Sequence, residues 1–79
     1  MFVIQMIKNV DGAEEITYLK CDEFCTPIHM RKLPQESKWA ATIVHLRSEA
    51  MEFSHRCEEV FRCKAKALPL RELNAVVVE

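Results

Sequence analysis

The sequence is poor in the residues that loosen or interrupt a chain, with one glycine and three prolines among 79 residues. Disordered tails and low-complexity linkers are rich in such residues, so a chain that is 49% hydrophobic reads as a folded domain. A chain this short forms one small α+β domain at most, and such a domain gains stability from a partner. With Gly12 as its single glycine, the chain also lacks the glycine-rich loops that cradle phosphates.

Charge of one sign and long apolar runs are lacking too. The formal net charge of -1 provides no overall field that would attract a nucleic acid. No stretch approaches the ~20 apolar residues that cross a bilayer. Residues 1–7 carry neither the cationic leader nor the cleavage site of a signal peptide. We therefore expect a cytoplasmic protein that makes no membrane contact and keeps its four cysteines as thiols.

Two stretches rich in β-forming residues, 2–8 and 15–21, flank Asp11-Gly12, a strong signal for a two-residue hairpin turn. The turn sets a register whose opposed pairs are Phe2 with Cys21, Met6 with Thr17, Ile7 with Ile16 and Lys8 with Glu15. Apolar side chains alternate onto both faces of this hairpin. We therefore expect both faces to be covered by other parts of the chain.

After Pro34 the apolar residues recur at alternating spacings of four and three, which is typical of an amphipathic helix. This stripe consists of Trp39, Ile43, Leu46, Ala50, Phe53, Cys57 and Val60. It predicts a helix over 35–65, although residues 63–67 could equally begin an extended segment. Such a helix would be roughly 45 Å long and would outreach a small sheet.

The last residues, 74–79, contain a β-branched run that is suited to pairing with the hairpin. Between hairpin and helix we expect a connection, with a short strand around 28–32. The predicted fold is thus a single α+β domain over 1–79 with the order ββαβ. It consists of a β-hairpin, one long amphipathic helix and a C-terminal strand, with a small antiparallel sheet packed on the helix.

A zinc-stabilised module is one alternative, because zinc prefers four thiolate or imidazole ligands. The candidate ligands are Cys21, Cys25, Cys57 and Cys63. Their spacing differs from the compact cysteine pairs of zinc modules, and Cys57 falls in the apolar stripe as a core residue would. We therefore predict no metal and no other cofactor.

A second alternative is a small dimeric regulator that binds nucleic acid. Arg31, Lys32 and Lys38 gather positive charge near the predicted helix start, where backbone N–H groups also favour anions. Trp39 is the single aromatic residue close to them in sequence, so a stacking platform is not evident. Nucleic-acid binding by this cluster is therefore the second interpretation, after protein binding.

The lead interpretation is a protein that binds another protein or protein complex and is not an enzyme, because no catalytic motif is present. It would act as an inhibitor, adaptor or small accessory subunit, and the surplus helix length favours a homodimer. The candidate contact residues are Ala40, Val44 and Met51 on a second apolar strip of the helix, and Ile16 and Tyr18 on the sheet. In its size and its lack of catalytic motifs the chain resembles short accessory and inhibitor proteins of bacterial viruses and mobile elements.

Overall fold

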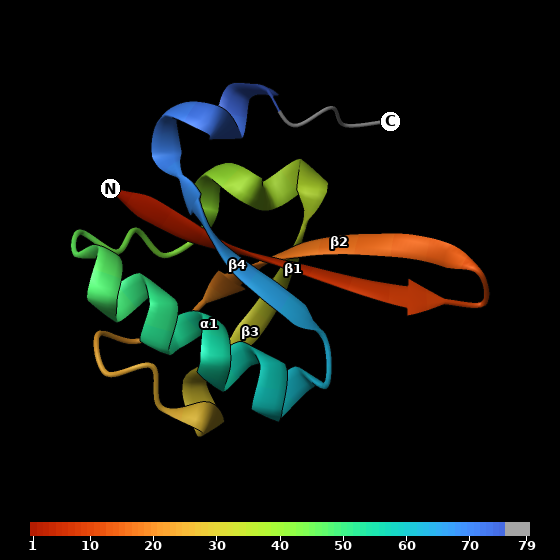
Figure 1. Cartoon of the computed structure of the whole chain (residues 1–79), viewed down its shortest axis with the longest axis horizontal. Helices are drawn as coiled ribbons and strands as arrows, with labels where there is room; N and C mark the ends of the chain where they lie inside the picture. Colours follow the sequence, from red (N-terminus) through yellow and green to blue (C-terminus); the bar gives the residue numbers. More distant parts are fainter. Residues whose placement is uncertain (76–79) are drawn as a thin grey trace.

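A computed structural model describes residues 1–75 and contains a four-stranded antiparallel sheet with the strand order β3-β2-β1-β4 (Figure 1). The strands are β1 (Phe2–Val10), β2 (Ala13–Lys20), β3 (Arg31–Pro34) and β4 (Lys64–Pro69). One α-helix, α1 (Arg47–Phe61), packs against β4 and β1. The α+β class and the order ββαβ are confirmed, with β3 as an additional edge strand.

The hairpin has the predicted turn and register. Asp11 and Gly12 both have positive φ, 52° and 82°, as a tight hairpin turn requires. Met6 pairs with Thr17, Ile7 with Ile16 and Lys8 with Glu15, as expected. The prediction for Phe2 is wrong, because β2 ends at Lys20 and Phe2 exchanges two 2.8 Å backbone hydrogen bonds with Val44 instead.

Both faces of the sheet are covered, as the sequence predicts. On one face, α1 and the connection 21–30 enclose a core that includes Ile4, Met6 and Leu19. On the other face, a smaller core around Val3 and Tyr18 is closed by short 3-10 segments. These segments are η2 (Gln35–Ala40) and η3 (Leu70–Ala75), and a third, η1 (Pro27–His29), lies within the connection.

The long helix predicted over 35–65 is wrong, because residues 41–46 are not helical and separate η2 from α1. In this crossing segment the chain passes from one face of the sheet to the other. Ala41 is buried in the smaller core, whereas Val44 is buried in the core beneath α1. Between them, the Thr42 N–H donates to the Leu19 carbonyl at 2.9 Å. The β-branched run Thr42-Ile43-Val44 favours this extended path over a helix.

The shorter helix changes the meaning of the apolar stripe. Ala50, Phe53 and Cys57 are buried beneath α1. The other four members of the stripe, Trp39, Ile43, Leu46 and Val60, are exposed. With 15 residues α1 is only about 22 Å long, so surplus helix length no longer supports a homodimer. No helix within residues 1–75 has the length and apolar character needed to cross a membrane.

The strand that completes the sheet lies earlier than predicted. The left-handed φ of 53° at Arg62 ends α1, and β4 follows directly at Lys64–Pro69. Of the predicted strand at 74–79, Asn74 and Ala75 belong to η3, and the remaining residues lie outside the described part of the chain. The short strand expected around 28–32 is β3, which begins at Arg31.

Candidate functional site

The five predicted contact residues do not share one surface. Tyr18 is 0% and Val44 is 3% exposed, so both are core residues and are not available to a partner. Ile16 is half-buried against the smaller core. Ala40 is exposed on η2, and Met51 on α1 is 54% exposed. Of these five residues, Met51 lines a groove between α1 and β4.

This α1–β4 groove has a volume of about 450 Å³. The helix contributes Arg47, Met51, Ser54, His55 and Glu58 to its lining, and the sheet contributes Phe2, Ala65, Lys66, Ala67 and Pro69. The helical residues have the spacing of a single helix flank, one turn after another. The groove therefore runs along β4, a strand at the edge of the described sheet.

Small side chains on β4 explain why the groove exists. Ala65 and Ala67 point to the side of the sheet that α1 covers, and both pack only partly against the core beneath the helix. Their methyl groups leave unfilled the space that larger residues would occupy. Glu58 closes one end, where its Oε2 accepts a 3.2 Å hydrogen bond from the Ala65 N–H.

A second hollow of about 590 Å³ continues the groove past the far end of β4. The two share Phe2, Arg47 and Pro69 in their linings. The hollow adds the Trp39 side chain, which is 60% exposed and has the Lys38 Nζ 5.7 Å from its ring centroid. The groove and the hollow thus adjoin, and their combined lining extends from Met51 to Trp39.

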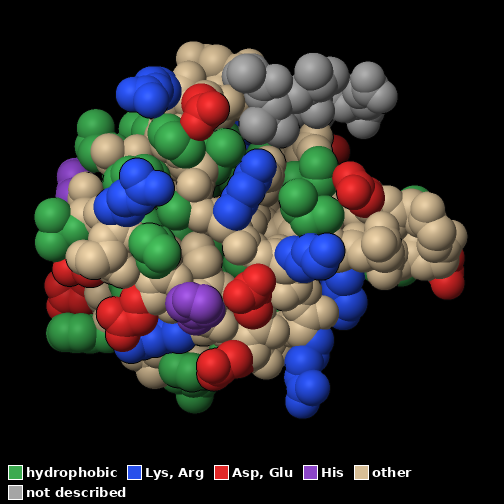
Figure 2. Space-filling model, in the orientation of Figure 1, with side chains coloured by type: hydrophobic (Ala, Val, Ile, Leu, Met, Phe, Trp, Pro, Cys, Tyr) green, Lys and Arg blue, Asp and Glu red, His purple; other side chains and the backbone are tan. Residues whose placement is uncertain are grey.

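Basic side chains outnumber acidic ones in this combined lining. The groove and the hollow together contain three cations, Arg47, Lys66 and Arg71, and one carboxylate, that of Glu58. Figure 2 shows this face of the molecule, where apolar, basic and acidic side chains lie interspersed over α1 and β4. The surface therefore suits a ligand that combines apolar and acidic groups.

Sequence reasoning missed the contribution of β4 to this site. A signal was present in Lys64-Ala65-Lys66-Ala67, which alternates charged and small residues with the period of a half-buried strand. The helix predicted over 35–65 included these residues, and the stated alternative of an extended segment beginning at 63–67 is the one that the structure has, as β4. Trp39 was assigned to the buried stripe and is instead exposed.

The basic cluster proposed for nucleic acid is not assembled on one exposed patch. Lys38 is buried, at 7% exposure, so it does not offer its side chain to a nucleic acid. Lys32 on β3 lies 3.8 Å from a carboxylate oxygen of Glu15, which offsets its charge. Arg31 is exposed at the edge of the sheet opposite β4.

The four cysteines gather on the α1 side of the sheet. Cys25 and Cys57 are buried in the core there, and Cys21 and Cys63 pack against it. Burial raises the pKa of the Cys25 thiol to about 12 and also raises the pKa of Cys57. Protonated thiols are poor ligands and nucleophiles. Within residues 1–75, no three histidine, cysteine or acidic side chains come together as a metal site.

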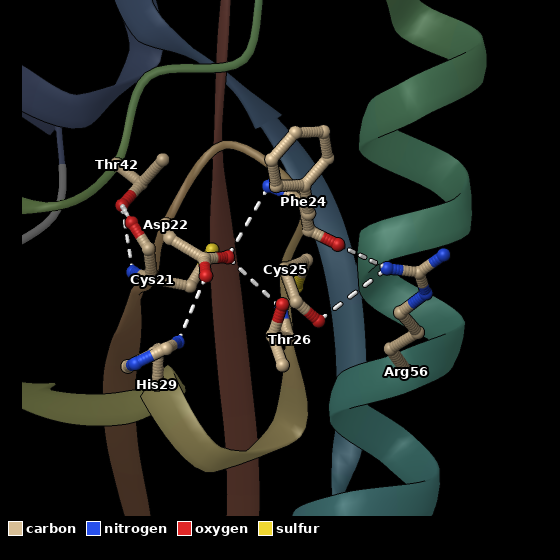
Figure 3. A network of polar contacts seen from close by, with 8 residues as sticks. All are labelled: Cys21, Asp22, Phe24, Cys25, Thr26, His29, Thr42 and Arg56. Carbon is tan, nitrogen blue, oxygen red and sulfur yellow. Dashed lines mark hydrogen bonds and ion pairs between the residues drawn. The ribbon is translucent and has the colours of Figure 1, made fainter.

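The connection 21–30 is held in shape by a network centred on Asp22 (Figure 3). One carboxylate oxygen of Asp22 accepts hydrogen bonds from the N–H groups of Phe24 and Thr26, at 3.2 and 3.0 Å. The other lies 2.9 Å from His29 Nδ1. The backbone hydrogen bond from Thr26, and then the neighbouring His29, lower the pKa of Asp22. This pattern is an Asx turn, which makes Asp22 a structural residue.

The helix anchors the same connection. Arg56 donates hydrogen bonds to the carbonyls of Phe24 and Cys25 and also pairs with Glu52 at 2.9 Å. The anchored connection displays Phe24 and Ile28, which are 70% and 84% exposed. Ile28 lines a separate hollow of about 370 Å³ beside His29 and Arg31, apart from the α1–β4 groove.

A comparison of the chain with protein-family models, curated proteins and solved structures finds no match in any of the three. The case for a function therefore comes from the geometry of the site alone.

Proposed function

We propose that the protein is a non-enzymatic interaction protein, an inhibitor, adaptor or small accessory subunit that binds a larger protein through the α1–β4 groove. The observation that carries this proposal is a pair of adjoining hollows whose linings include two exposed apolar side chains, Met51 on α1 and Trp39, which is 60% exposed. Concave sites that combine exposed apolar side chains with a few charged groups are typical of specific recognition.

Binding fits this surface better than catalysis does. Its titratable groups are three cations, one histidine and one carboxylate. The carboxylate, Glu58, already accepts a hydrogen bond from the Ala65 backbone, and His55 Nδ1 lies 3.7 Å from its other oxygen. The cysteines, the strongest nucleophiles of the chain, do not line the groove.

With 15 residues, α1 has no surplus length that would favour a homodimer. A second copy of the chain is one occupant that the groove could receive. Native mass spectrometry of the purified chain determines its oligomeric state. A stable dimer that the substitution Met51→Glu dissociates would indicate that a second copy binds in the groove.

The proposal is tested by affinity capture from cells that contain the protein, followed by binding measurements with each purified candidate. The test variant is Met51→Glu, which places a charge in the groove. The control is Ile28→Glu, which makes the same type of change at an exposed apolar residue of the connection 21–30. Both positions are solvent-accessible, so both variants should fold.

We expect a purified partner to bind the wild-type chain and Ile28→Glu equally, and to bind Met51→Glu at least about tenfold more weakly. Calorimetry gives the stoichiometry and the affinity. A partner that binds Met51→Glu as tightly as the wild type would show that the groove is not the binding surface.

A further inference from the structure

We propose that the α1–β4 groove binds an extended segment of the partner protein, which joins the sheet as a strand beside β4 and alternates acidic with large apolar side chains. This inference rests on the proposed function and specifies the chemistry of the partner. It starts from the position of β4 at the edge of the described sheet, with α1 alongside. Extended peptides bind to other proteins by adding a strand to such edges.

The backbone N–H and carbonyl groups of two β4 residues point toward the groove. Phe2 exchanges both of its backbone hydrogen bonds with Val44, on the β2 side of β1. Because backbone groups alternate along an antiparallel strand, the next residue, Val3, points its groups toward β4, and so do Gln5 and Ile7. Their register partners on β4 are Leu68, Lys66 and Lys64. The residues between these partners, Ala65 and Ala67, therefore point their backbone groups away from β1 and toward the groove.

The outer edge of β4 offers only a few backbone groups to a second strand, because some of its N–H groups are already bonded or missing. The Ala65 N–H is held by Glu58 at 3.2 Å, and Pro69 has no N–H to offer. In the described part of the chain no strand lies on this side of β4, so the Ala65 carbonyl and both backbone groups of Ala67 are left for a ligand. Proline and charged side chains are devices that keep an edge strand from pairing indiscriminately, so this edge favours a ligand with additional matching features.

Those features follow from the alternation of side chains on β4. Ala65 and Ala67 face the α1 side, where their small size leaves room for large apolar side chains beside Met51. Lys64 and Lys66 alternate with them and are exposed, and Lys66 also contributes to the lining of the groove. Side chains directly opposite each other on paired strands interact, and opposite charges stabilise the pair. A matching strand therefore places apolar residues toward α1 and carboxylates toward the lysines.

A nucleic acid fits this arrangement less well than a peptide does. Its backbone cannot reproduce the alternating N–H and carbonyl groups that pair with Ala65 and Ala67. The Glu58 carboxylate would also lie close to its phosphates. The excess of basic side chains around the groove is met by the carboxylates of an acidic peptide.

The test uses a displayed library of random peptides of about eight residues, a common strand length, selected on the full wild-type chain. A single-stranded oligonucleotide serves as a parallel probe. We expect the selected peptides to alternate acidic and large apolar residues. The best peptide should bind Lys66→Glu at least about tenfold more weakly than wild type, because like charges would then oppose each other. The control Arg31→Glu makes the same change on the opposite edge strand and should have no effect.

Peptide synthesis then tests strand addition itself. Two versions of the best peptide carry N-methyl groups on alternate residues, one version in each phase. Only one phase removes the N–H groups that point toward β4, so only that version should lose binding. On the protein, Ala67→Pro removes the outward Ala67 N–H and should weaken binding too, and its circular dichroism confirms that it folds.

The outcomes separate this inference from the proposed function. Any one of three results would overturn strand addition. These are equal binding of both N-methylated versions, an unaltered affinity of the peptide for Lys66→Glu, and no peptide binding up to about 1 mM. If a purified partner still depended on Met51 in those cases, the proposed function would stand. Binding of the oligonucleotide in the groove, lost in Lys66→Glu, would overturn the inference in favour of a nucleic-acid ligand.

Discussion

The hydrogen bond between Gln5 and Tyr18 should contribute measurably to stability. Gln5 Nε2 donates to Tyr18 Oη at 3.1 Å, and the two residues are only 5% and 0% exposed. They are register partners on neighbouring strands, so the bond ties the central pair of the sheet together on the face away from α1. Removing the acceptor in Tyr18→Phe leaves a buried amide group without its partner.

The expected cost of Tyr18→Phe is about 1–3 kcal/mol, which is the desolvation penalty of an unsatisfied buried polar group. A domain of this length has a total stability of about 4–12 kcal/mol, so the loss is large in proportion. The melting temperature should fall by about 4–8 °C for each kcal/mol. Urea unfolding, followed by circular dichroism, gives the free energy directly.

A double-mutant cycle isolates the bond from the other effects of each substitution. Gln5→Met is the matched partner variant, because it keeps the length of the side chain and removes the amide. If the bond matters as argued, the double variant Gln5→Met/Tyr18→Phe should be more stable than the sum of the single losses implies, by about 0.5–3 kcal/mol. Strict additivity would refute the reasoning.

Three further predictions concern burial, acid stability and the thiols. Val44→Glu should unfold the chain, whereas Met51→Glu should leave the melting temperature nearly unchanged, because Val44 is buried in the core and Met51 lies on the surface. The folded-state pKa of Asp22 is depressed below its ordinary 3.8, so its stabilising effect is present above that pH and is lost as the pH falls through the folded pKa. Urea midpoints at acidic and neutral pH should therefore differ less in Asp22→Asn than in wild type, and an equal difference would contradict this role. At neutral pH a thiol reagent should modify Cys25 and Cys57 only as fast as the protein opens, and fast labelling of both, located by mass spectrometry, would contradict their burial.

Local sequence signals predicted the hairpin because its structure depends on neighbouring residues. Asp11-Gly12 allows the two positive φ angles of the turn, and the turn alone fixes which residues oppose each other. The apolar residues on both faces also predicted that both faces would be covered, and they are. These features needed no knowledge of distant parts of the chain.

The helix boundaries were not predictable in the same way. Residues 39, 43 and 46 have helical spacing, but the chain uses residues 41–46 to cross between two cores. That path depends on contacts with Phe2 and Leu19, which are distant in sequence. The candidate site was missed for the same reason, because it needs β4 to pair with β1 from the other end of the chain. Met51 is exposed on α1, and its contact with a partner stays a prediction.

The central position of β1 has a consequence for synthesis on the ribosome. β1 is the first strand to be made, yet its second neighbour, β4, emerges only after β2, β3 and α1. Until then one side of β1 has no strand to pair with, and its apolar side chains lack the helix that covers them. Until β4 is made, the nascent chain therefore carries a strand that is paired on one side only and has apolar side chains on both faces, and such an exposed edge is prone to aggregation.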